Sequence, residues 1–145
     1  METIRIVLVD DHAMMRAHMH RLLQRVPGMQ VVGEAGNGIE AIHMVNRLAP
    51  DVMLLDMDMP ILNGVEVARE LFAAGSPVRI LALSAYDDKQ YILGLLSNGA
   101  AGYLTKDEVP KFIIEAIRRV AQGEKGWFSQ RAALRVASLS QAVEG

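Results

Sequence analysis

Four apolar runs along this chain end in side chains that can bind a cation or a phosphoryl group. These side chains are Asp10 and Asp11 after residues 4–9, Asp56 after 52–55, Ser84 after 78–83, and Lys106 after 102–104. The carboxyl ends of the strands in an open parallel sheet meet at one edge, where ligands bind. We therefore expect one edge of a sheet to gather carboxylates, a hydroxyl and an ammonium, which suits a divalent cation and a phosphoryl group.

Strand-like and helix-like runs alternate five times along the chain, which predicts an α/β fold with right-handed crossovers. The expected strands are 4–9, 30–35, 52–56, 78–83 and 102–105. The expected helices are 13–25, 38–49, 64–74, 87–97 and 109–122. The strands expected at 52–56 and 78–83 read as continuous apolar runs, as is typical of strands that helices cover on both faces.

The helix expected at 87–97 is the least well anchored. Its apolar residues spread around the helix axis, and Gly94 interrupts them at a cost of about 1 kcal/mol relative to alanine. Two interpretations remain open for this helix. It packs against neighbouring loops, or it presents an exposed apolar patch to a partner.

Composition excludes several classes of protein. The chain has 145 residues, the length of one domain, and its net charge of −2 argues against binding nucleic acid through the phosphates. It has no cysteine, so disulfides, zinc–thiolate sites and thiol nucleophiles are excluded. No apolar stretch approaches the roughly 20 residues of a membrane span. The first residues lead directly into a strand, which leaves no room for a secretion signal, so we expect a cytoplasmic location.

The residue types at the strand ends indicate phosphoryl chemistry. Mg²⁺ needs one or two carboxylates besides water and phosphate oxygens, and Asp10 or Asp11 together with Asp56 would supply them. Without an ion these carboxylates would repel one another, which raises the pKa of at least one. An ionised aspartate can attack phosphorus to form an acyl phosphate. Lys106 would offset the added charge, and Ser84 could donate a hydrogen bond to a phosphoryl oxygen.

Each of these residues also has a simpler interpretation. Asp11 could cap the helix 13–25, Asp56 could begin a loop, Ser84 could cap the helix 87–97, and Lys106 could be a solvated lysine. Taken singly, the simpler interpretations are favoured. Five residues whose side chains all suit cation or phosphoryl binding occur at four strand ends, which favours a common site over coincidence.

Three segments resemble the receiver domains of two-component response regulators of the NarL/FixJ (LuxR-type) class. The segments are Asp10–Arg16, Pro50–Pro60 followed by Asn63 and Gly64, and Gly99–Asp107. The resemblance covers residues 3–122. It implies a CheY-like, flavodoxin-like fold, which is a doubly wound five-stranded parallel sheet of order 2-1-3-4-5 with five flanking helices and a short C-terminal extension.

The resemblance also implies a metal site and an acceptor. Asp56 would be the phosphoacceptor. Asp10, Asp11, Asp56 and the backbone carbonyl of Asp58 would hold Mg²⁺ as the cofactor. Asp58 is acidic where this class usually has a neutral or basic residue, so the lifetime of the phosphoryl group is open.

Three further residues would carry the conformational change that follows phosphorylation. By resemblance, Lys106 binds the phosphoryl group, and the Ser84 hydroxyl moves toward it on phosphorylation. Tyr103 is the aromatic switch that fills the space that Ser84 leaves. The surface around the helix 87–97 would then be remodelled.

The implied partners are proteins. A sensor histidine kinase would donate the phosphoryl group and dock near Met14, Met15 and the loop after Lys106. Phosphorylation would favour a homodimer through the helix 109–122 or the helix 87–97. The chain would not be an enzyme beyond its own phosphotransfer and autodephosphorylation, and no membrane contact is expected.

We expect a receiver domain at residues 1–123 and a C-terminal extension or linker at 124–145. In the extension, Trp127 and Phe128 are typical of anchoring residues, Ser129 of a helix cap, and 130–138 of a short helix. The class normally continues into a helix-turn-helix output domain, which this chain does not contain. The parent protein is therefore expected to regulate transcription and to bind DNA only through that absent domain.

Three alternatives stay open. A phosphatase of the haloacid dehalogenase type also uses an Asp-x-Asp pair, which here would be Asp56 and Asp58. In that family the acidic metal pair follows the lysine in the chain, whereas here Asp10 and Asp11 come first. A degenerate receiver would act only by protein–protein interaction. A stand-alone receiver would signal without any output domain.

Overall fold

The computed structural model describes residues 3–57, 59, 62–84, 89–124 and 127–128. Its strands are β1 (Ile4–Val9), β2 (Met29–Ala35), β3 (Val52–Asp56), β4 (Arg79–Ser84), β5 (Gly102–Thr105) and β6 (Trp127–Phe128). Its helices are α1 (Ala13–Gln24), α2 (Gly38–Leu48), α3 (Gly64–Ala73), α4 (Lys89–Ser97) and α5 (Val109–Ala121), with a 3₁₀ turn η1 at Lys106–Glu108. None of the helices in these ranges has the length and apolar character that crossing a membrane requires.

All strands pair in parallel, in the order β2-β1-β3-β4-β5-β6. The predicted flavodoxin-like order of the first five strands is confirmed. The sixth strand was not predicted. It has two residues, Trp127 and Phe128, which pair with Gly102 and Tyr103 at the edge of the sheet. Two residues are too few to show an alternating pattern, so the sequence indicated only anchors there. The predicted cap at Ser129 and helix at 130–138 lie outside the described residues.

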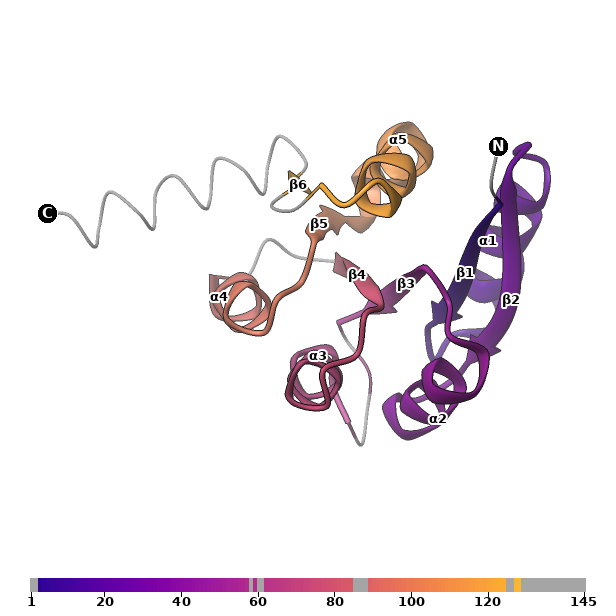
Figure 1. The fold of residues 1–145 in the computed structure, drawn as a ribbon. Coiled ribbons are helices and arrows are strands. Elements are labelled where there is room, and N and C mark those ends of the chain that lie inside the picture. The colour runs from indigo at the N-terminus through magenta and orange to yellow at the C-terminus, as the bar shows by residue number, and fades with distance from the viewer. Residues whose placement is uncertain (1–2, 58, 60–61, 85–88, 125–126, 129–145) are drawn as a thin grey trace, which may run out of the picture.

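Helices cover both faces of the sheet (Figure 1). Because successive side chains of a strand point to opposite faces, β3 contributes to two apolar clusters. Met53 and Leu55 pack with residues of α2, α3 and α4, whereas Val52 and Leu54 pack with residues of α1 and α5. Every residue of β3 is buried, which accounts for the continuous apolar run at residues 52–55.

Helix α4 is anchored more closely than the sequence indicated. Ile92 and Leu95 are buried in the cluster that α3 shares, while Leu93 is 49% exposed. A Cβ atom at Gly94 would lie only 2.9 Å from Cγ1 of Val65 on α3. Gly94 therefore allows the two helices to approach closely, and its cost in helix propensity is offset by that packing. The side chains of Tyr91 and Leu96 lie outside the described part of this helix.

A reciprocal pair of hydrogen bonds fixes the start of α3, just beyond the loop that follows β3. The Asn63 side chain accepts the backbone N–H of Glu66 at 3.0 Å, and the Glu66 carboxylate accepts the backbone N–H of Asn63 at 3.2 Å. This capping box satisfies two backbone donors that would otherwise lack a partner within the helix. It therefore defines where the loop from the sheet edge ends.

We expect Asn63→Ala to lower the free energy of unfolding by about 1 kcal/mol, the usual cost of losing such a cap. Urea denaturation followed by circular dichroism measures the change. Asn46→Ala is the matched control, because Asn46 is exposed on α2 and its replacement should change stability by less than about 0.5 kcal/mol. Equal effects of the two substitutions would contradict the role assigned to the cap.

Candidate functional site

The structure gathers the predicted strand-end residues at one edge of the sheet. Strands β1, β3, β4 and β5 are neighbours, and their carboxyl ends carry Asp10, Asp56, Ser84 and Lys106. Ligand atoms of Asp10, Asp11 and Asp56 lie within 4.8 Å of one another. Asp58, the remaining predicted metal ligand, lies outside the described residues.

The Asp56 carboxylate is almost completely buried, and Lys106 lies directly against it. Asp56 is 1% exposed, and Nζ of Lys106 is 3.1 Å from its Oδ1. A buried carboxylate is costly unless a cation or hydrogen bonds compensate it. Lys106 follows β5 and begins η1, so the sheet order brings its ammonium to the end of β3 across β4. This ion pair is the electrostatic centre of the site.

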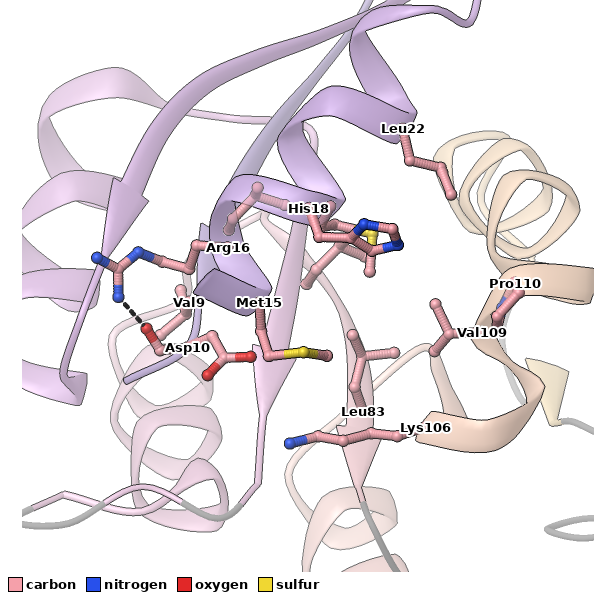
Figure 2. Close-up of a pocket in the computed structure, with 13 residues that line it drawn as sticks. Val9, Asp10, Met15, Arg16, His18, Leu22, Leu83, Lys106, Val109 and Pro110 are labelled. Carbon is pink, nitrogen blue, oxygen red and sulfur yellow. Dashed lines mark hydrogen bonds between the residues drawn. The ribbon is translucent and has the colours of Figure 1, made fainter. Parts of the chain in front are cut away.

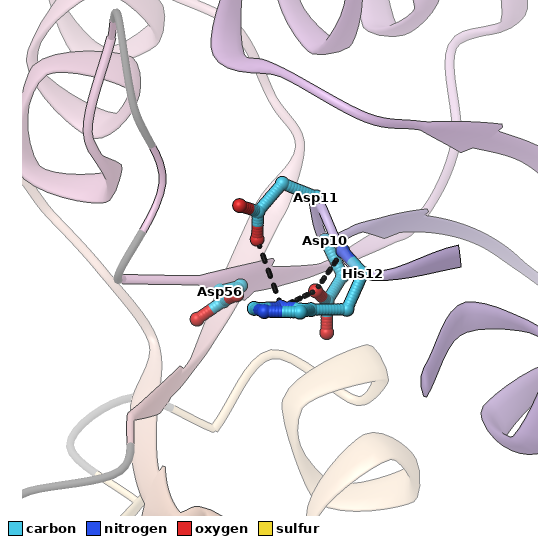
Figure 3. Close-up of side chains that lie close together, drawn as sticks. All are labelled: Asp10, Asp11, His12 and Asp56. Carbon is cyan, nitrogen blue, oxygen red and sulfur yellow. Dashed lines mark hydrogen bonds and ion pairs between the residues drawn. The ribbon is translucent and has the colours of Figure 1, made fainter. Parts of the chain in front are cut away.

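Asp10, Asp11 and His12 lie close to Asp56 (Figure 3). The Asp10 carboxylate accepts the backbone N–H of His12 at 2.8 Å. The carboxylates of Asp10, Asp11 and Asp56 together with Lys106 carry a formal charge of minus two, which one divalent cation would balance. Carboxylate oxygens are the ligands that Mg²⁺ prefers, and one or two suffice besides water and phosphate oxygens. The donor set of this site therefore fits Mg²⁺.

Burial raises the pKa of Asp10 above its ordinary value of 3.8. The hydrogen bond from the His12 backbone opposes this shift, and the negative charge of Asp56 adds to it. The positive charge of Lys106 and the His12 side chain lower the pKa to a smaller extent. The predicted rise in a carboxyl pKa is confirmed for Asp10. Its main cause is burial, whereas the sequence indicated repulsion between carboxylates.

Ser84 and Tyr103 both lie inside the fold near this edge. Ser84 is the buried last residue of β4 and pairs with Thr105 of β5. Tyr103 is 1% exposed and belongs to the same apolar cluster as Ile92 and Leu95 of α4. The tyrosine ring therefore occupies an interior position from which it contacts the α4 side of the core.

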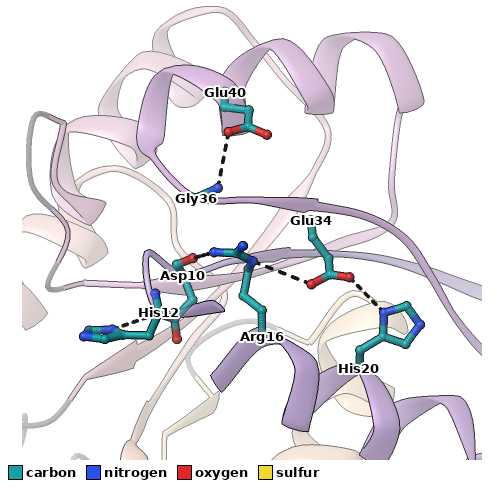
Figure 4. Close-up of polar contacts among 7 residues, drawn as sticks. All are labelled: Asp10, His12, Arg16, His20, Glu34, Gly36 and Glu40. Carbon is teal, nitrogen blue, oxygen red and sulfur yellow. Dashed lines mark hydrogen bonds and ion pairs between the residues drawn. The ribbon is translucent and has the colours of Figure 1, made fainter. Parts of the chain in front are cut away.

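Sequence reasoning missed a polar network that supports Asp10 from the side of α1 (Figure 4). An Nη1–H of Arg16 donates to the backbone carbonyl of Asp10. Nε of Arg16 lies 3.6 Å from Glu34 on β2, and that carboxylate is also 3.0 Å from Nδ1 of His20. Arg16 and His20 are four residues apart and so share one helix face. That spacing is visible in the sequence, but the packing of this face against β2 is not.

A cavity of about 160 Å³ adjoins the site between α1 and α5 (Figure 2). Figure 2 shows Met15, His18 and Leu22 of α1 on one side of it, and Val109 and Pro110 of α5 on the other. Its wall also includes Asp10 and Lys106. Met14 and Met15 are 85% and 47% exposed at the start of α1. An apolar surface thus lies directly beside the carboxylates.

The chain resembles known signalling proteins throughout this fold. The family model of the response regulator receiver domain matches residues 6–118. The transcriptional regulatory protein DegU of Brevibacillus brevis is 41% identical over 120 residues, which cover 83% of this chain and 51% of DegU. The nitrate/nitrite response regulator protein NarP of Escherichia coli (strain K12) is 41% identical over 126 residues, which cover 87% of this chain and 58% of NarP.

A solved structure agrees with these sequence matches. The crystal structure of a LuxR-family two-component response regulator from Aurantimonas sp. SI85-9A1 has a TM-score of 0.89 and 32% identity, and the match covers 96% of this chain and 99% of that one. The chain therefore has the fold of this relative. It spans only 51% and 58% of the lengths of DegU and NarP.

We expect Asp10→Asn to stabilise the metal-free fold at neutral pH. Because the pKa of Asp10 is raised in the folded chain, the folded state binds more protons than the unfolded state between 3.8 and the higher folded value. Stability therefore falls as the pH rises through that window, and above it the ionised carboxylate destabilises the fold. Urea denaturation in EDTA at pH 7 should show a more stable variant, and its advantage should shrink as the pH falls through the window.

Excess Mg²⁺ provides the control for this comparison. An ion that binds the folded state stabilises it, and the parent chain, which keeps the full set of carboxylates, should gain more than the variant. An Asp10→Asn chain that is no more stable than the parent at pH 7 would contradict the prediction. So would an advantage that grows on acidification.

Proposed function

This chain belongs to the response regulator receiver domain family, and we propose that it accepts a phosphoryl group on Asp56 with the help of Mg²⁺. The observation that carries the proposal is the buried Asp56 carboxylate, with Lys106 at 3.1 Å and two further carboxylates beside it. Asp56 is the carboxylate of this cluster that already has the positively charged ammonium of Lys106 beside it. It is therefore the one at which added phosphoryl charge is best compensated.

The proposed reaction forms an acyl phosphate. A carboxylate oxygen of Asp56 attacks the phosphorus of a phosphohistidine, and the P–N bond breaks with its electron pair returning to the imidazole. Lys106 moves from compensating the carboxylate to compensating the phosphoryl oxygens. Asp10, Asp11 and Asp56 would hold Mg²⁺, which when bound neutralises part of the phosphoryl charge.

Return to the resting state is proposed to be hydrolysis. Water breaks the acyl phosphate, so that Asp56 regains its carboxylate and inorganic phosphate leaves. In this hydrolysis the chain acts on its own acyl phosphate and not on a separate phosphate ester, which distinguishes it from a phosphatase of the dehalogenase type. Asp58 is proposed to influence the rate of this hydrolysis, and its backbone carbonyl is proposed to be a ligand of Mg²⁺.

The proposed switch runs from Asp56 through Ser84 and Tyr103 to α4. Ser84 would donate its hydroxyl proton to a phosphoryl oxygen, and Tyr103 would stabilise that arrangement from the interior. Tyr103 lies in the same apolar cluster as Ile92 and Leu95, which supports a link to α4. A change there would alter the surface around the exposed Leu93 and favour a homodimer through α4 or α5.

A sensor histidine kinase is the proposed donor, and the start of α1 is its proposed docking surface. Met15 and Pro110 are exposed and line the cavity together with Asp10 and Lys106. Met14, which precedes Met15 in α1, is 85% exposed. An apolar surface at this position would hold the kinase helix that carries the phosphohistidine within reach of Asp56.

The parent protein is proposed to be a DNA-binding transcription regulator that acts in the cytoplasm. Residues 1–123 would be its receiver domain, and 124–145 would lead toward a helix-turn-helix output domain. The support is that DegU is named a transcriptional regulatory protein, and that this chain spans 51% of it. A receiver that works alone or only as an interaction module is the second candidate. Extending the chain to the natural stop codon of its gene would distinguish these possibilities.

We expect incubation with acetyl phosphate and Mg²⁺ to add one phosphoryl group to the chain, as measured by intact mass. EDTA should prevent the adduct, and mild base should remove it, because an acyl phosphate is labile. Asp56→Asn should abolish the adduct and leave the fold intact, since asparagine has nearly the same shape and lacks the nucleophilic oxygen.

Asp51→Asn is the matched control, because Asp51 precedes β3 and its carboxylate accepts the backbone N–H of Arg5 at the other end of the sheet. It should be phosphorylated like the parent chain. Unchanged labelling of Asp56→Asn would move the acceptor to another residue. An absent adduct under all conditions would favour the interaction-module alternative.

We expect Met14→Lys to slow phosphoryl transfer from a histidine kinase by at least about tenfold, the effect of losing about 1.4 kcal/mol of binding at the docking surface. Transfer from acetyl phosphate should be unchanged, because that donor is too small to use the surface. Ile39→Lys is the control, since Ile39 is 53% exposed on α2. A kinase that phosphorylates Met14→Lys and Ile39→Lys equally fast would place its docking surface elsewhere.

A further inference from the structure

The His12 side chain extends into the cluster of carboxylates (Figure 3). Its Nδ1 atom lies 3.2 Å from Oδ1 of Asp10 and 3.0 Å from Oδ1 of Asp11. Together with an oxygen of Asp56, these ligand atoms all lie within 4.8 Å of one another. His12 therefore adds a nitrogen donor to three oxygen donors.

The spacing of these atoms suits a shared metal ion. Ligands bound at about 2.1 Å in octahedral geometry lie about 3.0 Å apart when they are adjacent. The two contacts of Nδ1, at 3.2 and 3.0 Å, are close to that separation. The imidazole thus occupies a place from which it can share an ion with both carboxylates.

The imidazole has no competing role in the helix that it precedes. His12 is the N-cap residue of α1, a position where Ser, Thr, Asp or Asn usually accepts a backbone N–H. Its side chain makes no such cap hydrogen bond. It is also 63% exposed, so it contributes little to the core. Its contacts with Asp10 and Asp11 are the interactions that hold it in place.

We propose that His12 is an additional metal ligand, which gives this site a high affinity for a borderline transition-metal ion such as Ni²⁺ or Co²⁺. The inference rests on the proposed metal site at Asp10, Asp11 and Asp56. Imidazole nitrogen suits Co²⁺, Ni²⁺ and Zn²⁺, whereas Mg²⁺ prefers oxygen. His12 should therefore strengthen the binding of transition-metal ions and contribute little to the binding of Mg²⁺.

The test compares two metals on one set of variants. Ni²⁺ binding is measured by calorimetry and Mg²⁺ binding by NMR titration, on untagged protein at a single pH. The variants are the parent chain, His12→Ala, His12→Asn and, as matched control, His18→Ala. His18 is an exposed histidine on α1 that lies outside the acidic cluster. Circular dichroism checks that each variant is folded.

We expect His12→Ala to weaken Ni²⁺ binding by at least about tenfold, since even groups that only orient a ligand contribute about 10- to 100-fold. Mg²⁺ binding should change far less. His12→Asn keeps a polar side chain but lacks the imidazole, and should likewise lose Ni²⁺ affinity while retaining Mg²⁺ affinity. His18→Ala should match the parent for both metals.

A second readout identifies the ligand directly. With Co²⁺ bound, the ring protons of a ligating histidine give strongly shifted NMR signals, and one such set should disappear in His12→Asn. These signals report coordination and do not depend on phosphorylation.

The outcomes separate this inference from the proposed function. If Mg²⁺ binds the parent chain but Ni²⁺ affinity is unchanged in His12→Ala, the inference is wrong and the proposed magnesium site stands. The same holds if His12→Ala alters Ni²⁺ and Mg²⁺ affinity equally, because His12 would then act only through its charge. If the parent chain binds no Mg²⁺, the proposed site itself fails.

Discussion

The burial of one carboxylate at the end of the central strand β3 constrains the rest of the site. Asp56 is 1% exposed, and its negative charge is tolerated because Lys106 approaches within 3.1 Å. Lys106 follows β5, which is separated from β3 by β4, so the ion pair depends on the order and register of three strands. Apolar clusters on both faces of the sheet pack against these strands. The chemistry of the site therefore depends directly on the packing of the core.

Helix α1 supplies the other half of the site, through residues that follow β1 within a few positions. His12 contacts the carboxylates of Asp10 and Asp11, and Arg16 donates to the Asp10 carbonyl while it lies close to Glu34 on β2. The network fixes Asp10 from its backbone, so that the carboxylate can face the cluster. The same stretch exposes Met14, and its neighbour Met15 lines the cavity that α5 borders. The carboxylates, the residue that supports them and an exposed apolar surface thus lie in the short loop after β1 and the first turns of α1.

Local patterns in the sequence were sufficient to predict the α/β class, the strands and the strand-end residues, whereas the strand order followed from the resemblance to receiver domains. Strand β3 was predicted with its observed bounds, and Asp56 followed from them. Contacts that depend on how one element packs on another were not predictable. The proximity of Val65 to Gly94, and that of Arg16 to Glu34, each depend on the placement of a helix. The two-residue strand β6 was missed because it is too short to have a pattern.

The cause of the Asp10 pKa shift also depends on packing and was therefore not predictable from the sequence. Sequence reasoning counted charges, and so expected repulsion to dominate. In the folded chain the loss of solvent is the larger effect, and the charge of Asp56 comes after the hydrogen bond from His12. A carboxyl group that is destabilised chiefly by burial gains from any cation that replaces the lost water. The fold thus stores at this edge an unfavourable energy that cation binding would relieve, and this couples occupancy of the site to the stability of the sheet.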